Sequence, residues 1–193
     1  MKQNMLYKLE KLDEKLVIVD KNNLAHNYKI IKNRAGISKI ISVIKGDSYG
    51  HGMVECSRTL YQSGTRDFYL ARLEDAIKIR KENYKNTNIY LLSGTISKNV
   101  CKKIKDHNIT PIINNLQQLE ILDKYSNTIK YVLHFDTGMN RLGFKFTEIE
   151  KIKNLSKDNR IKFIMTHLSS ADEKNTVVGS INPTKVIKVL FGG

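Results

Sequence analysis

Two patterns of apolar residues alternate along this chain. Six short runs are almost continuously apolar, as in strands that are buried on both faces, and the longer stretches between them repeat apolar residues at helical spacing. The predicted strands are Lys39 to Ile44, Phe68 to Ala71, Asn88 to Leu92, Thr110 to Ile113, Lys130 to Phe135 and Lys162 to Thr166. This alternation predicts repeated βαβ units and a parallel sheet.

Polar residues mark the starts of two of the predicted helices. Ser97 precedes the helical stretch from Lys98 to His107, and Asn114 or Asn115 precedes a stripe of leucines that we assign to the core. These residue types cap helices because their side chains accept hydrogen bonds from the free N–H groups of the first turn.

One further apolar run, Leu16 to Val19, precedes the six-strand repeat. We interpret it as a strand outside the main sheet. The helical spacing that follows predicts a helix beginning near Asn22 or Asn23.

Repeated βα units form either an open doubly wound sheet or a barrel of eight strands, and the spacing of the units fits both. Residues with reactive side chains follow three separated strands: Lys45, the loop from Asp136 to Phe144, and His167. Both folds place their chemistry at the carboxyl ends of strands, but a site drawn from three separated strands favours the barrel.

Composition indicates a single soluble domain. The chain has 193 residues, of which 40% are hydrophobic and 27% charged, and its net charge is +14. Such a charge invites a nucleic-acid partner, but the basic residues are mostly scattered lysines, without arginine clusters, RNA-binding aromatic signatures or zinc-ligand spacing. We therefore predict neither a nucleic-acid partner nor a bound metal.

The two cysteines, Cys56 and Cys101, lie in segments of helical pattern and provide neither a disulfide framework nor a metal-ligand set. The amino-terminal segment lacks the apolar core of a signal peptide, and no apolar run approaches the ~20 residues that span a bilayer. We predict a cytoplasmic protein without membrane contact.

Lys45 is the first candidate for a chemical role, because it ends a buried apolar run. Most such lysines are solvated strand ends. Here the amine is followed by three glycines that permit unusual turns, and by the rings of Tyr49 and His51. A cofactor that carries a carbonyl group and is held as an imine would use such a site.

Arg141 and His167 are the other candidates. A guanidinium on a loop can bind both oxygens of a carboxylate, which suits an amino-acid or organic-acid substrate, although a structural pair with Asp136 is an equal alternative. A single histidine at a strand end is more often packed than catalytic. The segment from Phe68 to Ala76 is interpreted as structural.

Taken together and in order, these stretches resemble bacterial alanine racemase, a pyridoxal-phosphate enzyme whose N-terminal domain is an eight-stranded α/β barrel. The resemblance runs from about Leu16 to Glu173. Its most specific blocks are Lys45 with Tyr49 to Gly52, Asp136 to Gly143, and Thr166 to Glu173.

The resemblance implies a role for each candidate residue. Lys45 would hold pyridoxal 5'-phosphate as an imine and act as the base on one face of the substrate. Tyr49 would hydrogen-bond the cofactor phosphate, Arg141 would orient the substrate, and His167 would contact the pyridine ring.

The resemblance also implies an activity and an assembly. The reaction would interconvert L-alanine and D-alanine, with serine as the next substrate to consider, and would supply D-alanine for peptidoglycan. The expected assembly is a homodimer, in which a tyrosine from the partner's C-terminal β domain is the second base.

The chain departs from the family in two respects. Residues 1–173 would form only about six of the eight βα units, the C-terminal β domain is absent, and residues 174–193 diverge in a way that suggests a frameshift or a truncation. In addition, His134 stands where many members carry a lysine that supports the substrate-facing arginine.

Two alternatives to a racemase remain open at this stage. One is a single-domain pyridoxal-phosphate carrier without racemase activity, which also places a lysine after its first barrel strand. The other is an inert product of a broken gene. The blocks at Asp136 to Gly143 and Thr166 to Glu173 favour the racemase over the carrier.

Overall fold

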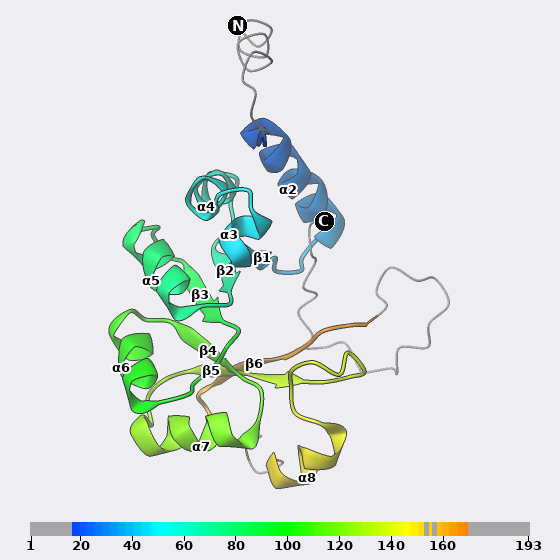
Figure 1. Ribbon diagram of the computed structural model, residues 1–193. Coiled ribbons are helices and arrows are strands. Elements are labelled where there is room, and N and C mark those ends of the chain that lie inside the picture. The colour runs from blue at the N-terminus through cyan, green and yellow to red at the C-terminus, as the bar shows by residue number, and fades with distance from the viewer. Residues whose placement is uncertain (1–16, 153–154, 156–157, 170–193) are drawn as a thin grey trace, which may run out of the picture.

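A curved parallel sheet forms the centre of the computed structural model, which describes residues 17–152, 155 and 158–169 (Figure 1). Six strands follow one another across the sheet in chain order, each hydrogen-bonded in parallel to the next. They are β1 (Ser42–Val43), β2 (Asp67–Leu70), β3 (Asn88–Leu91), β4 (Thr110–Ile113), β5 (Tyr131–Phe135) and β6 (Ile161–Thr166). The six predicted strands are confirmed; five differ from the prediction by one residue or less at each end, whereas β1 comprises only two of the six residues predicted from Lys39 to Ile44.

The strand order decides between the two predicted folds. A doubly wound sheet reverses its order at a switch point, whereas a barrel adds each strand beside the previous one. The order β1 to β6 has no reversal, and the sheet curls as part of a barrel does. The prediction of an incomplete α/β barrel is confirmed.

Helices connect the strands and cover the outer face of the sheet (Figure 1). They are α2 (Lys21–Ala35), α3 (Lys45–Tyr49), α4 (Met53–Gln62), α5 (Leu73–Lys81), α6 (Lys98–Asp106), α7 (Leu116–Tyr125), the 3-10 turn η1 (Phe146–Glu148) and α8 (Ile149–Ile152). Cys56 and Cys101 lie in helices, α4 and α6, as predicted, and both are buried free thiols. None of the helices in the described ranges is long and apolar enough to cross a membrane.

Polar caps start three of these helices. Ser97 accepts a hydrogen bond from the N–H of Val100, and Asn115 accepts one from the N–H of Gln118, so the predicted start of α6 is confirmed and Asn115 is the cap of α7. Asp20 caps α2, whose helix therefore begins at Lys21, slightly earlier than predicted.

The strand predicted over Leu16 to Val19 is wrong where it falls on described residues. Residues 17–20 form no regular secondary structure, and Val17 and Ile18 are 79% and 57% exposed. A strand needs a neighbour to satisfy its backbone groups, and no described strand pairs with this segment. The chain instead passes directly into α2 at its Asp20 cap.

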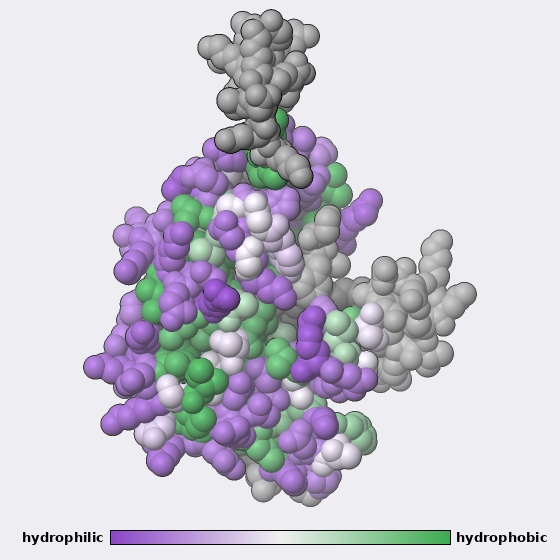
Figure 2. Space-filling view, viewed as in Figure 1, coloured by the Kyte–Doolittle hydropathy of each residue, from purple (hydrophilic) through white to green (hydrophobic). Residues whose placement is uncertain are grey.

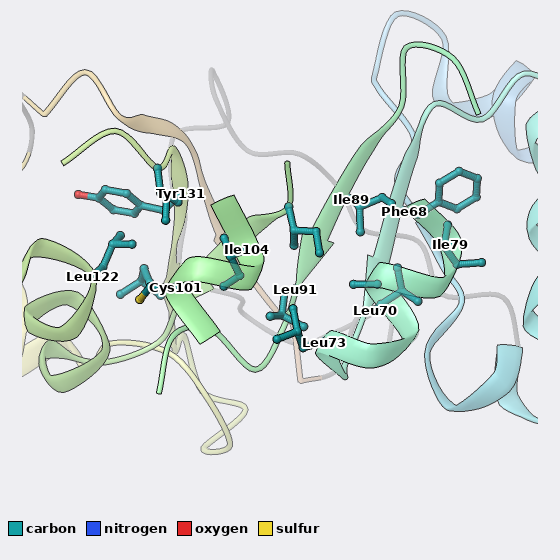
Figure 3. Close-up of a cluster of buried hydrophobic side chains, with 14 of the residues drawn as sticks. Phe68, Leu70, Leu73, Ile79, Ile89, Leu91, Cys101, Ile104, Leu122 and Tyr131 are labelled. Atoms are coloured by element: carbon teal, nitrogen blue, oxygen red, sulfur yellow. The ribbon is translucent and has the colours of Figure 1, made fainter. Parts of the chain in front are cut away.

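Two apolar clusters lie on the two faces of the sheet. Alternate residues of β2 show the division: Phe68 and Leu70 point outward to the helices, and Tyr69 points into the barrel interior. Figure 3 shows the outer cluster, where strand and helix side chains meet. Burying a large apolar side chain contributes about 1.5–3 kcal/mol, so this cluster provides much of the stability.

The inner cluster fills the curve of the sheet. It contains Ile41, Tyr69, Tyr90, Ile112, Val132 and Met165. The rings of Tyr69 and Tyr90 meet edge to face, with their centroids 5.3 Å apart. Hydrophilic side chains cover most of the face seen in Figure 2, and apolar ones gather toward the middle of that view.

A buried carboxylate stabilises the amino ends of the strands. Asp67 is almost fully buried and accepts hydrogen bonds from Asn88 (2.9 Å) and from the Tyr90 hydroxyl (3.0 Å). Lys39 completes the site with an ion pair of 2.9 Å. Such pairing is what a buried charge requires, and it makes this the structural end of the barrel.

Candidate active site

A cavity of about 340 Å³ opens at the carboxyl ends of the strands. Each of the six strands, or the residues directly after it, contributes to the lining. Lys45, Arg141 and His167 all line this cavity, so three of the four predicted site residues are brought together. Tyr49, the fourth, lies beside Lys45 and outside the lining.

Lys45 begins an unusual left-handed turn. The four residues after it have φ between 53° and 59°: Gly46, Asp47, Ser48 and Tyr49. The turn is closed by hydrogen bonds from the N–H of Ser48 to the Ile44 carbonyl (3.1 Å) and from the N–H of Gly50 to the Gly46 carbonyl (3.0 Å). Left-handed geometry costs about 1–2 kcal/mol for each residue with a side chain, and such strain concentrates at functional sites.

The turn leaves the Lys45 amine partly buried at the cavity. Partial burial, together with the charge of Arg141, lowers the pKa of Lys45 below its ordinary value. The Lys45 nitrogen lies 5.9 Å from the centre of the Tyr49 ring, and Tyr49 is half exposed. The amine is therefore shifted toward its neutral, nucleophilic form.

Arg141 lies on a tightly closed loop after β5. The Asp136 carboxylate accepts hydrogen bonds from the N–H groups of Gly138 and Asn140, both 3.0 Å, and these bonds lower the pKa of Asp136. The Phe144 N–H donates to the His134 carbonyl at 2.7 Å and closes the base of the loop. In the part of the chain that the structure describes, Asp136 does not pair with Arg141, so the structural alternative for Arg141 is not realised.

His134 is buried at the end of β5 and lines the same cavity. Its Nδ1 lies 2.8 Å from the side-chain oxygen of Asn114, while its Nε2 is buried and has no hydrogen-bond partner among the described residues. Burial and the nearby His167 lower the pKa of His134 to about 4. The imidazole is therefore neutral at neutral pH.

His167 follows β6 and is partly buried. Burial lowers its pKa, as do the charges of Arg141 and Lys45. The preceding residue, Thr166, donates to the Phe135 carbonyl (2.9 Å) and lies 2.7 Å from the Thr137 hydroxyl. These contacts join the end of β6 to the loop that carries Arg141.

Comparison with known proteins identifies the family. The family model for the N-terminal domain of alanine racemase matches residues 19–182. The chain belongs to this family. It is 32% identical over 164 residues to an alanine racemase of Rickettsia africae and 35% identical over 141 residues to one of Rickettsia bellii.

Solved alanine racemases share the fold. The enzyme of Bartonella henselae, described with covalently bound pyridoxal phosphate, matches with a TM-score of 0.73 and 26% identity, over 81% of this chain and 46% of that one. The Pseudomonas aeruginosa enzyme matches with a TM-score of 0.74 and 25% identity, over 83% of this chain and 46% of that one. The chain spans less than half the length of the relatives it matches; the Rickettsia africae alignment covers 81% of this chain and 46% of the relative. Residues 170–193 lie outside the described ranges, so the predicted boundary at residue 173 and the origin of the tail stay predictions.

The side chains that line the cavity carry an excess of basic groups. Lys45, Arg141, His134 and His167 line it, and the charge of Arg141 contributes, after burial, to the lowered pKa values of Lys45, His134 and His167. Asp136 is the nearby acid, and backbone N–H groups already bind its carboxylate. The cavity therefore favours an anionic ligand. No set of three or more metal-binding side chains occurs among the described residues.

Several residues that line the cavity were not predicted from the sequence, and three of them are informative. Tyr69 and Ala71, in a segment interpreted as structural, line the cavity, and so does Asn114, which was considered only as a helix cap. Alternation along β2 is the signal that would have placed Tyr69 and Ala71 on the inner face. Nothing in the local sequence indicates the contact between Asn114, which follows β4, and His134 of β5.

Proposed function

We propose that this cavity binds pyridoxal 5'-phosphate through Lys45 and forms part of an alanine racemase active site, which interconverts L-alanine and D-alanine. The observation that carries the proposal is the partly buried Lys45 amine, whose pKa is lowered, in the same cavity that Arg141 lines. We propose a cytoplasmic enzyme that supplies D-alanine for peptidoglycan. Serine is the second substrate to test.

The residues present fit this cofactor. Two buried polar atoms of the cavity residues, the Tyr69 hydroxyl and His134 Nε2, have no partner among the described residues, as expected of groups that await a ligand. The excess of basic side chains suits a molecule that carries a phosphate. Tyr49 is exposed enough to offer its hydroxyl to that phosphate, and His167 lines the cavity where it can face the ring.

Lys45 and Arg141 have different proposed roles, which follow from their chemistry. Bound pyridoxal phosphate withdraws electrons and so acidifies the Cα–H of an amino acid. Lys45 removes or returns the proton on one face, because its lowered pKa leaves more of the amine neutral. Arg141 binds the substrate carboxylate with its planar guanidinium.

Inversion requires a second acid or base on the opposite face of the substrate. We propose that it comes from outside the residues that the structure describes, as a tyrosine of a partner subunit in a homodimer. In this proposal the basic groups of the cavity bind the cofactor and the substrate. The proton transfer on the opposite face of the substrate depends on the partner subunit.

A cofactor-binding experiment tests the proposal. Pyridoxal phosphate is added to the purified chain, the visible absorbance is recorded, and the product is reduced with borohydride and mapped by mass spectrometry. We expect modification at Lys45, its loss in Lys45→Ala, and its retention in Lys102→Ala, which alters an exposed lysine of α6.

A racemisation assay on L-alanine then separates the remaining alternatives. Racemisation supports the full proposal. Attachment at Lys45 without racemisation supports a cofactor carrier or a fragment that needs a partner. If no attachment occurs at Lys45, the proposal is wrong, and the absence of racemisation as well would favour an inert product.

A further inference from the structure

A second group of charged side chains lies at the amino ends of the strands, opposite the end that carries the cavity. Asp67 and Asn88 begin β2 and β3, each two residues before a tyrosine of the inner cluster, and residues two apart in a strand share a face. Lys162 of β6 joins them: its amine donates to the Asn88 side-chain oxygen at 3.1 Å and lies 5.2 Å from the centre of the Tyr90 ring. Side chains of three strands therefore meet at this end.

Positive charge exceeds negative charge in this group. Lys39 pairs with the Asp67 carboxylate at 2.9 Å, and that carboxylate accepts two further hydrogen bonds. The charges of Lys39 and Lys130 both disfavour the charged form of Lys162. We name the polar residues of this group the amino-end site: Lys39, Asp67, Asn88, Lys130 and Lys162. Three amines less one carboxylate leave two positive charges in excess.

Lys162 is a cation of the site that lacks a counter-charge. The residue as a whole is exposed, so a ligand can reach it, but its amine is partly dehydrated, and this burial is the largest cause of its lowered pKa. Its hydrogen-bond partner, the Asn88 amide, is neutral. Within the described ranges neither Lys162 nor Lys130 forms an ion pair, and Asp67 is already bound to Lys39. Because a dehydrated charge is favourable only when it is paired, a bound anion would stabilise this end.

We propose that the amino-end site binds an oxyanion of the phosphate class, through Lys162 with Lys39 and Lys130 beside it. An anion with several oxygens accepts hydrogen bonds from more than one amine, and each lysine offers three donors on a compact charge. One dianion balances the two charges in excess. The phosphate is either free or part of a small molecule. The proposal does not depend on the proposed function, because Lys45 lies at the other end of the strands.

Chemical-shift mapping on the full chain tests the proposal. Backbone ¹H–¹⁵N spectra are recorded during titration with inorganic phosphate and, at matched ionic strength, with sodium chloride. We expect phosphate to shift the amides around Asn88 and Lys162 until the site saturates, with a much smaller effect of chloride. Phosphate that enters the cavity shifts the amides beside Lys45 instead, so binding at the two ends is measured separately.

Lys162→Met removes the charge but keeps an unbranched side chain. The affinity for phosphate at the amino-end site should fall about tenfold, as expected for the loss of one hydrogen bond to a charged group. Any phosphate shifts beside Lys45 should stay as they are in the native chain. Lys130→Met, at an exposed residue, should also weaken binding. The matched control is Lys102→Met, which removes one positive charge from an exposed position of α6 outside the site and should change nothing.

A parallel titration with glycerol phosphate distinguishes the two sources of the anion. Tighter binding of inorganic phosphate identifies the free ion, and tighter binding of glycerol phosphate identifies a phosphate monoester; either result at the amino-end site supports the proposal.

Three results would overturn the proposal. They are shifts confined to the cavity end or absent, equal shifts with chloride, and an unchanged affinity at the amino-end site in Lys162→Met. If Lys162→Met does not fold, Lys130→Met provides the same comparison. Cofactor attachment is detected at Lys45 and phosphate at the opposite end, so either proposal can fail without the other.

Discussion

At the scale of residues, the candidate site is a set of basic groups in which a positive charge on one group disfavours the charged form of its neighbours. Arg141 contributes to the lowered pKa values of Lys45, His134 and His167. Burial is the larger cause for each of them, because a partly dehydrated cation loses stabilisation by water. An arginine stays charged at all ordinary pH values, so its charge lowers the pKa values of the neighbouring lysine and the two histidines.

The pH dependence of cofactor attachment follows from this coupling. Attachment requires the neutral amine of Lys45, whose lowered pKa moves that form to lower pH. Arg141→Gln removes the positive neighbour, so the pKa of Lys45 rises and the midpoint of attachment moves to higher pH. Absorbance titrations of the native chain, Arg141→Gln and the control Arg34→Gln, an exposed residue of α2, measure the midpoints. A midpoint that stays in place or moves to lower pH would contradict this coupling.

Two adjacent asparagines should differ in their effect on stability. Asn114 is buried and bonds to Leu92, Ile112 and His134, whereas Asn115 is exposed and caps α7 with one bond. We expect Asn114→Ala to lower the free energy of unfolding by about 2–4 kcal/mol, because it leaves buried partners unsatisfied.

The cap substitution Asn115→Ala should cost about 1 kcal/mol. Urea denaturation of the two variants measures the difference. Equal losses would show that the buried network around Asn114 contributes no more than a helix cap.

At the scale of elements, the loop that carries Arg141 depends on Gly143. This glycine has φ 114°, and a Cβ there would lie 2.6 Å from the backbone nitrogen of Asp136. Gly143→Ala should therefore lower the free energy of unfolding by about 2–4 kcal/mol, or open the loop. Gly36→Ala is the matched control, because Gly36 also has a positive φ, 57°, but open space around its Cβ position.

The control should cost only about 1–2 kcal/mol, the strain of left-handed geometry alone. Thermal unfolding of both variants gives the comparison, and the affinity for propionate, a carboxylate the size of alanine, shows whether Arg141 has moved. If Gly143→Ala is as mild as Gly36→Ala, the loop has more room than its close backbone contact indicates.

The elements themselves were largely predictable from the sequence, because their signals are local. Continuous apolar runs gave the six strands, and polar caps such as Ser97 gave the helix starts. The left-handed turn at Asp47, Ser48 and Tyr49 was not predictable, since residues with side chains rarely adopt it and only the surrounding fold stabilises it.

The same distinction applies to the site. Lys45, Arg141 and His167 were found because each follows a recognisable strand. The contact between His134 of β5 and Asn114, just after the neighbouring strand β4, depends on the register of the two strands, which the local sequence does not determine.

At the scale of the molecule, the sheet has two edges. Among the described residues β1 pairs only with β2, and β6 only with β5, so the first and last strands are not joined as in a closed barrel (Figure 1). An unpaired edge presents N–H and C=O groups that can pair with another chain. Ile164 of β6 is 48% exposed, which adds apolar surface at that edge.

Self-association of the chain should therefore depend on salt. The open edges and apolar surface favour association, whereas the net charge of +14 makes two copies repel. Salt screens that repulsion over a Debye length of about 10 Å at 0.1 M and leaves apolar contacts in place. Light scattering with size-exclusion chromatography should show larger species at about 0.5 M sodium chloride than at about 0.05 M. A chain that stays monomeric at both concentrations, unfolds cooperatively and binds no hydrophobic dye would show that its edges are protected.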